Sequence, residues 1–267
     1  MIQEMEIRNY SPRTIKTYVT LLSFFLRHCK KSLSKITTND LKDYIYYRLK
    51  NDEISVSTIN QIISAWKIVY VYILGCDWEG CRIQRPRREK KLPVVLSQEE
   101  VLALIESPLN IKHHAILNVL YSTGIRCNEL IYLRPSDIDS KRMVINIRQG
   151  KGKKDRQVRL HEKVLKLLRT YFLKYRPEKY LFEGMKEGNP YSATSIRKII
   201  SSHAKKTGIT KNISVHTFRH CYATHMLEKG ANLKVIQLQL GHSSIKTTSI
   251  YLSLANINIS SLPNPLD

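Results

Sequence analysis

Several features that would place this chain in a specialised class are missing from its sequence. No stretch approaches the roughly 18 uninterrupted apolar residues that a membrane-spanning helix needs. The opening residues, MIQEMEIRNY, do not have the charged-then-apolar layout of a secretion signal. We therefore expect a folded, soluble protein that works in the cytoplasm.

Cysteine is scarce and its spacing is uninformative. The odd number of cysteines and the lack of a C-x-x-C pair indicate neither a disulfide framework nor a zinc site. We expect reduced, mostly buried thiols at the five positions Cys29, Cys76, Cys81, Cys127 and Cys221. No G-x-x-x-x-G-K-[ST] loop for a nucleoside triphosphate is present either.

Acidic residues are few compared with basic ones. The chain has 22 Asp and Glu against 44 Lys and Arg, a formal net charge of +22. Such an excess attracts polyanions. Nucleic acid is the expected partner, although charge alone fits a ribosomal or a membrane-surface protein equally well.

The sequence of residues 1–81 predicts a set of amphipathic helices. With 267 residues and 42% hydrophobic content the chain can build two domains with real cores. Ser11 is an N-cap residue before a run with helical spacing, and Thr37 with Asp40 marks a second helix start. Apolar residues at helical spacing over 59–73 predict a third helix. Residues 1–81 are thus predicted to form a helical bundle.

A basic segment, RIQRPRREKK, follows at residues 82–91 and contains six basic residues and a proline. It can neither bury apolar area nor support a stable helix, so it marks a linker between residues 1–81 and a second domain over 92–267. It is either a solvated connector or a strap along a phosphate backbone. The strap would contact DNA through Arg85, Arg87, Arg88, Lys90 and Lys91.

The second domain is predicted to be helical with one β-hairpin. Ser97 and Glu100 form a capping box. The alternation in MVINIRQ and RQVRL, on either side of a glycine-containing basic turn, indicates two short strands. Helices are expected near residues 112–123, 127–134, 161–175, 193–207, 216–229, 232–240 and 244–254. The fold class is therefore mainly α with a small β-hairpin.

The segment TGIRCNEL at 123–130 places Arg126 after a glycine-permitted turn and at the start of a helix. A guanidinium there can face an anion beside backbone N–H groups. A plain surface arginine is the alternative. Glu129, three residues later, either orients Arg126 or forms an ordinary ion pair with it.

The segment HTFRH places His216 and Arg219 on one helical face, so a proton-transfer group and a phosphate clamp can point at one spot. The rival prediction makes His216 and His220 metal ligands. A zinc helix needs a glutamate where Thr217 stands, and Arg219 between the histidines opposes a cation. No metal is therefore expected, and His220 and His225 are given no role.

The segment LGH ends a helix at Gly241 and exposes His242, and Tyr251 follows nine residues later. One tyrosine among 15 means little by itself. The ordered set of TGIRCNEL, the G-K-G turn, HTFRH, LGH and the tyrosine resembles the tyrosine recombinase family of phage integrases and Xer-type recombinases. The resemblance covers the whole chain and is most specific in its second half.

This resemblance implies an N-terminal SAM-like core-binding domain and a C-terminal catalytic domain that together clamp duplex DNA. It also implies a monomer in solution and a homotetramer on two DNA sites, with strand exchange through a Holliday junction. The 16 residues after Tyr251 would dock on a neighbouring subunit, or form a disordered tail.

The resemblance also assigns roles to residues. Tyr251 would form a 3′-phosphotyrosyl link and Lys151, in the hairpin turn, would protonate the leaving 5′ oxygen, with Lys153 and Lys154 as competitors for that role. His216 would assist proton movement and Glu129 would hold Arg126. The phosphate oxygens would be contacted by Arg126, Arg219 and His242. No cofactor is required.

Two rival functions share these residues. A type IB topoisomerase uses the same chemistry, but the short basic chain with a separate N-terminal bundle favours recombination. A DNA-binding regulator that has kept the fold without cleaving is the alternative from a different class. Because every catalytic position of the family is filled in this chain, we expect an enzyme.

Overall fold

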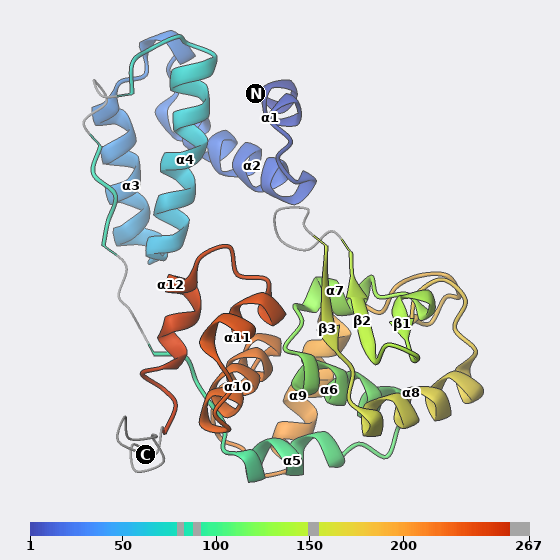
Figure 1. The fold of residues 1–267 in the computed structure, drawn as a ribbon. Helices are drawn as coiled ribbons and strands as arrows, with labels where there is room; N and C mark the ends of the chain where they lie inside the picture. The colour runs from blue at the N-terminus through green and yellow to red at the C-terminus, as the bar shows by residue number, and fades with distance from the viewer. Residues whose placement is uncertain (79–82, 88–91, 149–154, 257–267) are drawn as a thin grey trace. The chain divides into compact units, whose positions relative to one another are not determined.

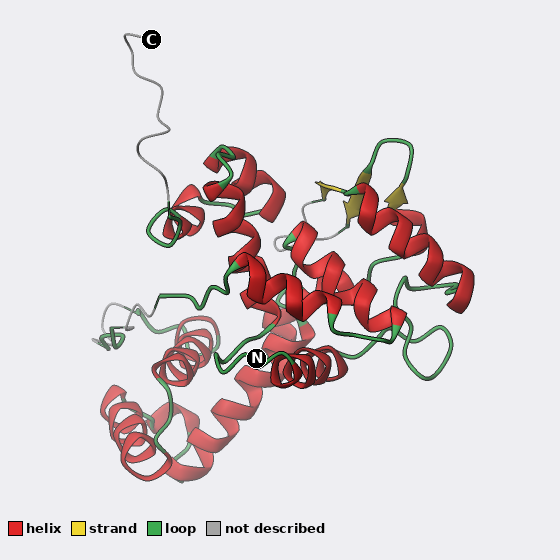
Figure 2. Ribbon diagram, turned by 90° about the horizontal axis from the view of Figure 1, so that it is seen from below, coloured by secondary structure: helices red, strands yellow, loops and turns green. Residues whose placement is uncertain are grey.

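The computed structural model describes residues 1–78, 83–87, 92–148 and 155–256, and the chain divides into two compact units, Met1–Lys91 and Leu92–Asp267 (Figure 1). Helices dominate both units, and the strands gather in one small sheet (Figure 2). The predicted fold class, mainly α with a small β element, is confirmed. Within these described residues no helix is long and apolar enough to cross a membrane.

The first unit consists of helices that begin at well-formed caps. Ser11 accepts a hydrogen bond from the backbone of Thr14, and Thr37 and Asp40 form a reciprocal capping box, as their sequence predicts. The elements are α1 (Ile2–Ile7), α2 (Pro12–Cys29), the 3-10 turn η1 (Leu33–Lys35), α3 (Thr38–Asp52) and α4 (Val56–Tyr72).

An aromatic cluster lies at the centre of this unit. The ring of Phe25 on α2 is 5.2 Å from that of Tyr44 on α3 and 5.3 Å from that of Trp66 on α4, all measured between centroids. All three residues are buried, as are the aliphatic side chains around them. Large aromatic groups in offset or edge contact contribute both buried area and orientation, so this cluster holds the three helices together.

The second unit is built around α6. Its residues Ala115, Ile116, Leu117, Val119 and Leu120 are fully buried on every side, which is typical of a central helix. The helices of this unit are α5 (Gln98–Glu106), α6 (Ile111–Thr123), α7 (Cys127–Ile131), α8 (Glu162–Tyr175), α9 (Ala193–Lys206), α10 (Val215–Glu228), α11 (Leu233–Leu240) and α12 (Ile245–Thr248), with 3-10 turns η3 (Pro135–Asp137) and η4 (Ser249–Tyr251).

The sheet of this unit contains the predicted hairpin and one further strand. Strand β2 (Val144–Ile147) pairs antiparallel with β3 (Arg156–Arg159), so that Ile145 lies opposite Val158 with both side chains buried. On its other edge β2 pairs with β1 (Ile138–Asp139). The alternation of buried and exposed positions that predicts the hairpin is present in β2 and β3. The two-residue β1 is too short to show any alternation.

Two predicted helices end earlier than expected. Helix α7 stops at Ile131 instead of continuing to 134, because Pro135 disfavours helical backbone at the residue before it. The helix expected over 244–254 is only α12, followed by the 3-10 turn η4. Hydroxyl and β-branched residues over 247–250 favour helix weakly, and the tight turn brings Tyr251 inward.

Candidate active site

The residues singled out by the motifs come from four separated elements of the second unit. Arg126 is the N-cap residue of α7, and Arg219 lies in the first half of α10. His242 follows the glycine that ends α11, and Tyr251 closes η4. Their side chains meet because the ends of α6, α11 and η4 converge beside α10.

A glycine at the end of α6 creates the turn that places Arg126. Gly124 has a φ of +61°, and a Cβ there would lie 2.7 Å from Tyr222 and 2.9 Å from Leu240. Any other residue would therefore meet both backbone strain and a clash. The glycine in this motif allows α6 to end and the next residues to turn toward α10.

Arg219 is fixed by the ends of two helices. Its Nη1 donates to the carbonyl oxygen of Gly124 at 2.7 Å and its Nη2 donates to that of Leu240 at 2.6 Å. The residue is 3% exposed. Carbonyl oxygens at helix C-termini carry partial negative charge and stabilise a cation there. Burial, followed by the nearby Arg126, lowers the pKa of Arg219 to about 10, so the group stays charged at neutral pH.

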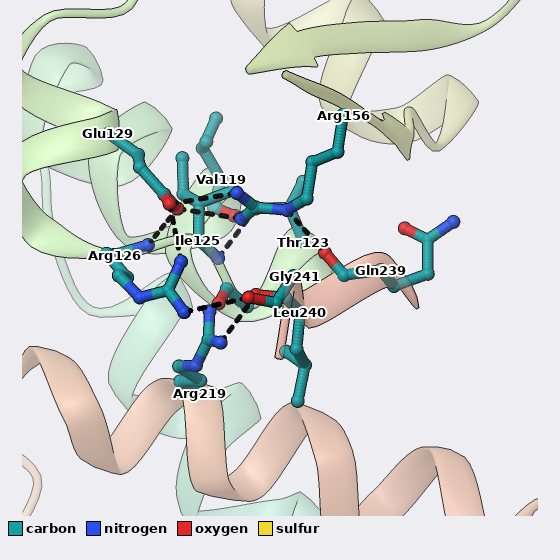
Figure 3. A network of polar contacts seen from close by, with 11 residues as sticks. Val119, Thr123, Ile125, Arg126, Glu129, Arg156, Arg219, Gln239, Leu240 and Gly241 are labelled. Atoms are coloured by element: carbon teal, nitrogen blue, oxygen red, sulfur yellow. Dashed lines mark hydrogen bonds and ion pairs between the residues drawn. The ribbon is translucent and has the colours of Figure 1, made fainter. Parts of the chain in front are cut away.

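Glu129 holds two arginines at once (Figure 3). Its Oε1 accepts from Arg126 Nη1 at 2.7 Å, and its Oε2 accepts from the Arg126 backbone at 2.7 Å. Arg156 of β3 approaches from the other side and donates to both carboxylate oxygens, at 2.8 and 2.7 Å. Burial opposes ionisation of Glu129, but the bonds from Arg156 and Arg126 outweigh it and lower the pKa to about 2.

Arg156 also ties the sheet to the end of α11. Its Nε donates to the carbonyl oxygen of Gln239 at 2.8 Å. A Cβ on Gly241 would lie 2.9 Å from the Arg156 side chain, and Gly241 has a φ of +63°. Gly241 is therefore required both for the left-handed turn and for the passage of Arg156. Arg126 Nη2 donates to the Gly241 carbonyl oxygen at 3.2 Å, which closes the network.

The network has a formal excess of positive charge. It contains three guanidinium groups, those of Arg126, Arg156 and Arg219, and a single carboxylate, that of Glu129, which bonds to the first two. Two positive charges thus remain uncompensated within the network. Arginine forks of this kind match the oxygens of a phosphate, so the arrangement is suited to bind a phosphodiester.

Tyr251 is buried beside these cations. It is 2% exposed, and its hydroxyl lies 3.1 Å from Nδ1 of His220. Burial raises the pKa of Tyr251, while Arg219 and Arg126 act in the opposite direction. The ring of His242 is nearly parallel to the Tyr251 ring, with 6.4 Å between centroids, and His242 Nδ1 lies 2.9 Å from Thr248 Oγ1.

His216 lies at the solvent edge of the same site. Its side chain is exposed, and its ring centroid is 6.4 Å from that of His220 one turn later on α10. Partial loss of hydration, with the charges of Arg219 and Arg126, lowers the pKa of His216. Among the residues that the structure describes, no cluster of three or more His, Cys, Asp or Glu side chains could hold a metal ion.

Comparison with known proteins identifies the family. Residues 95–256 match the Phage integrase family, and residues 1–80 match the Phage integrase, N-terminal SAM-like domain. This chain belongs to the phage integrase family. The match covers both units, and the function predicted from the sequence, that of a site-specific tyrosine recombinase, is confirmed.

Individual members of the phage integrase family resemble this chain over nearly its full length. A tyrosine recombinase of Thermosipho africanus is 33% identical, covering 94% of this chain and 92% of the relative. Tyrosine recombinase XerA of Pyrococcus furiosus is also 33% identical, over 92% of this chain and 85% of the relative.

Two solved structures extend the comparison. The crystal structure of XerA recombinase is 33% identical with a TM-score of 0.57, and covers 97% of this chain and 92% of that one. The XerH recombinase bound to palindromic difH substrate shares the fold, with a TM-score of 0.76 at 23% identity over 95% of this chain and 80% of that one.

Eight further predicted site residues belong to the linker 82–91 and to the segment between β2 and β3. Lys151, Lys153, Lys154, Arg88, Lys90 and Lys91 lie outside the described residues. Arg87 is exposed. Arg85, expected as a DNA contact, is exposed and donates to the carbonyl and side-chain oxygens of Asn60 on α4, at 3.0 and 3.1 Å, and to Ser64 at 3.0 Å. These bonds fasten the start of the linker to the first unit.

Two residues of this integrase-family site were missed by sequence reasoning. Arg156 precedes the buried Val158 by two positions, so it lies on the inward face of β3, where a cation needs a buried partner. That pattern was a usable signal. The sequence assigns no role to His220, although it follows Arg219 directly and lies one helical turn after His216.

Proposed function

We propose that this recombinase cuts and rejoins duplex DNA by attack of Tyr251 on a DNA phosphate, which forms a 3′-phosphotyrosyl link. The observation that carries the proposal is the burial of Tyr251 against a network with two uncompensated positive charges. Such a site lowers the energy of a phosphodiester transition state, in which negative charge increases on the non-bridging oxygens. Relatives solved with difH substrate and with transposon DNA support duplex DNA as the substrate.

The remaining site residues have the following roles in this proposal. Arg126, Arg219 and His242 contact the non-bridging oxygens of the phosphate, and Glu129 holds Arg126 in place through two hydrogen bonds. Arg219 is preorganised, since two helix ends fix its guanidinium before any ligand arrives. His216, at the solvent edge, moves protons to and from the site.

Lys151 protonates the leaving 5′ oxygen, and in the sequence it lies between strands β2 and β3, the second of which carries Arg156. The covalent link stores the energy of the cut bond, so a 5′ hydroxyl from another strand reseals it without a nucleoside triphosphate. The reaction therefore needs no cofactor in this proposal.

We further infer a monomer in solution that assembles as a homotetramer on two DNA sites and exchanges strands through a Holliday junction. In this proposal, domains 1–81 and 92–267 clamp the duplex and the basic segment 82–91 crosses the phosphate backbone between them. The net charge of +22 supports a strong, salt-dependent attraction to DNA. In this proposal the reaction takes place in the cytoplasm.

Covalent trapping tests the proposal. Purified protein is mixed with nicked duplexes tiled across the DNA that flanks its own gene, and the products are separated on a denaturing gel. We expect a slower, protease-sensitive band that is absent from Tyr251→Phe and present with the control Tyr132→Phe, whose side chain is exposed. DNA binding without a covalent band from any tile or distant site would favour a non-cleaving regulator. Relaxation of supercoiled DNA without site dependence would favour a topoisomerase.

A further inference from the structure

The nucleophile of this site must lose a proton, and one imidazole touches it. The Tyr251 hydroxyl lies 3.1 Å from Nδ1 of His220, and the two rings are 5.7 Å apart between centroids. A tyrosine oxygen that bonds to phosphorus has to release its phenolic hydrogen during the attack. We propose that Nδ1 of His220 accepts that proton, an assignment that rests on the proposed function of Tyr251 as the nucleophile.

The protonation state of His220 fits this role. Burial, then the neighbouring His216 and Arg219, lowers the pKa of His220 to about 4. The ring is therefore neutral at pH 7 and its Nδ1 can accept the Tyr251 O–H, with the hydrogen on Nε2. A bound phosphate brings negative charge beside the arginines, which makes the protonated imidazole less costly at the moment of attack.

Other groups of the site are less suited to take the proton. Arg219, which interacts with Tyr251, is a donor and cannot accept. The carboxylate of Glu129 already accepts two hydrogen bonds from Arg126 and two from Arg156, and its low pKa opposes protonation. His216 is exposed, so it serves better as the route by which the proton leaves for solvent.

The step balances without any other reactant. As the Tyr251 oxygen bonds to phosphorus, its proton moves to His220 and the bond from phosphorus to the 5′ oxygen breaks. The leaving 5′ oxygen receives a proton from the hairpin lysine. On resealing, the 5′ hydroxyl returns a proton to the lysine and the Tyr251 oxygen leaves with the proton held on His220. His220 is then neutral again, ready for a further cycle.

The test separates the nucleophile's proton from that of the leaving group. Covalent complex formation is measured in single turnover on two nicked duplexes, one normal and one with sulfur in place of the bridging 5′ oxygen, because a thiolate leaves without protonation. We expect His220→Gln to slow the reaction about 10²-fold on both substrates. Lys151→Ala should be slow only on the oxygen substrate. The control His114→Gln, on α6, should match the wild type on both.

Chemical rescue distinguishes proton transfer from a structural contribution. Added imidazole should raise the rate of covalent complex formation by His220→Ala at least about tenfold. DNA affinity and thermal midpoint should be unchanged in both His220 variants. Cleavage by His220→Gln within about threefold of wild type would overturn the assignment, because glutamine keeps a hydrogen-bond acceptor but takes no proton at neutral pH. So would a lost rate that imidazole does not restore.

Failure of the proposed function gives a different result from failure of this inference. If wild-type protein forms no covalent complex on any duplex, then Tyr251 is not a nucleophile and both proposals are wrong. If wild type forms the complex, Tyr251→Phe does not, and His220→Gln reacts at the wild-type rate, then only the role of His220 is wrong.

Discussion

Two helices in different units of this recombinase begin with an acidic residue that accepts a hydrogen bond from the N-cap backbone, and the two carboxylates are used differently. Asp40 accepts from the Thr37 backbone in a reciprocal capping box at the start of α3, and Glu129 accepts from the Arg126 backbone at the start of α7, where the arginine side chain cannot accept in return. The pKa of each carboxyl is lowered to about 2. The Asp40 partners are Lys31 and the Thr37 cap near the surface, whereas Glu129 is 5% exposed between two arginines.

The difference shows how one capping device acquires a second use. At the surface, water competes with Lys31 for Asp40, so the ion pair adds little beyond the cap itself. In the interior, the Glu129 charge and its arginines depend on one another, because a buried charge without a partner is costly. The second unit thus uses the carboxylate at a helix start to hold Arg126, which we propose binds phosphate, together with Arg156.

Removing the Glu129 charge should have the largest effect. In Glu129→Gln the amide would present hydrogens toward a guanidinium that also donates, so we expect a loss of about 3–4 kcal/mol in the free energy of unfolding. Displacement of Arg126 should slow covalent complex formation on the order of 10²-fold. Urea unfolding and single-turnover trapping measure the two effects, with the exposed Glu162→Gln as a control. A loss below about 1 kcal/mol would mean that the network does not depend on this charge.

Acid should reveal the same contribution in the unaltered protein. Since the folded-state pKa of Glu129 is depressed from 4.5 to about 2, its contribution is present above pH 4.5 and is lost as the pH falls toward 2. That shift corresponds to about 3 kcal/mol. Unfolding free energies between pH 6 and 3 should converge for wild type and Glu129→Gln. Parallel curves for the two proteins would assign the acid sensitivity to other groups.

Replacing the Arg156 guanidinium with an ammonium group tests how much its geometry contributes beyond its charge. Arg156→Lys keeps the positive charge but cannot donate to both Glu129 oxygens and to Gln239 at once. We expect a loss of about 2 kcal/mol in unfolding free energy and a slower cleavage step with DNA affinity retained. The control is Arg159→Lys, on the same strand with an exposed side chain. Equal behaviour of the two variants would show that only the charge matters.

Most of this fold could be predicted from local patterns, and the reason is physical. Caps such as Ser11, Thr37 and Ser97 act through neighbours three residues away, so the sequence contains the whole interaction. The hairpin follows from alternation in the same way. The early end of α7 follows from Pro135 and was also open to prediction, whereas the broken helix before Tyr251 depends on weak propensities and on packing, which local patterns describe poorly.

The candidate site likewise contains residues that local motifs predict and contacts that they do not. Arg126, Arg219 and Tyr251 belong to recognisable motifs, and the structure places them together. The contacts of Arg156 with Glu129 and of His220 with Tyr251 join residues 27 and 31 positions apart. Neither local segment specifies its partner, so these contacts are established only when β3 packs against α7 and η4 packs against α10.

The smallest loss in unfolding free energy is expected at Asp40, the carboxylate near the surface. Asp40→Asn keeps a side-chain oxygen for the Thr37 backbone but removes the charge next to Lys31. We expect a loss of no more than about 1 kcal/mol, which shrinks further in 1 M salt because exposed charges are screened. Unfolding in low and high salt, with Glu129→Gln measured alongside, tests this. If Asp40→Asn lowers the free energy of unfolding as much as Glu129→Gln does, burial does not explain the difference between the two carboxylates. The role of Glu129 would then depend on its two arginines alone.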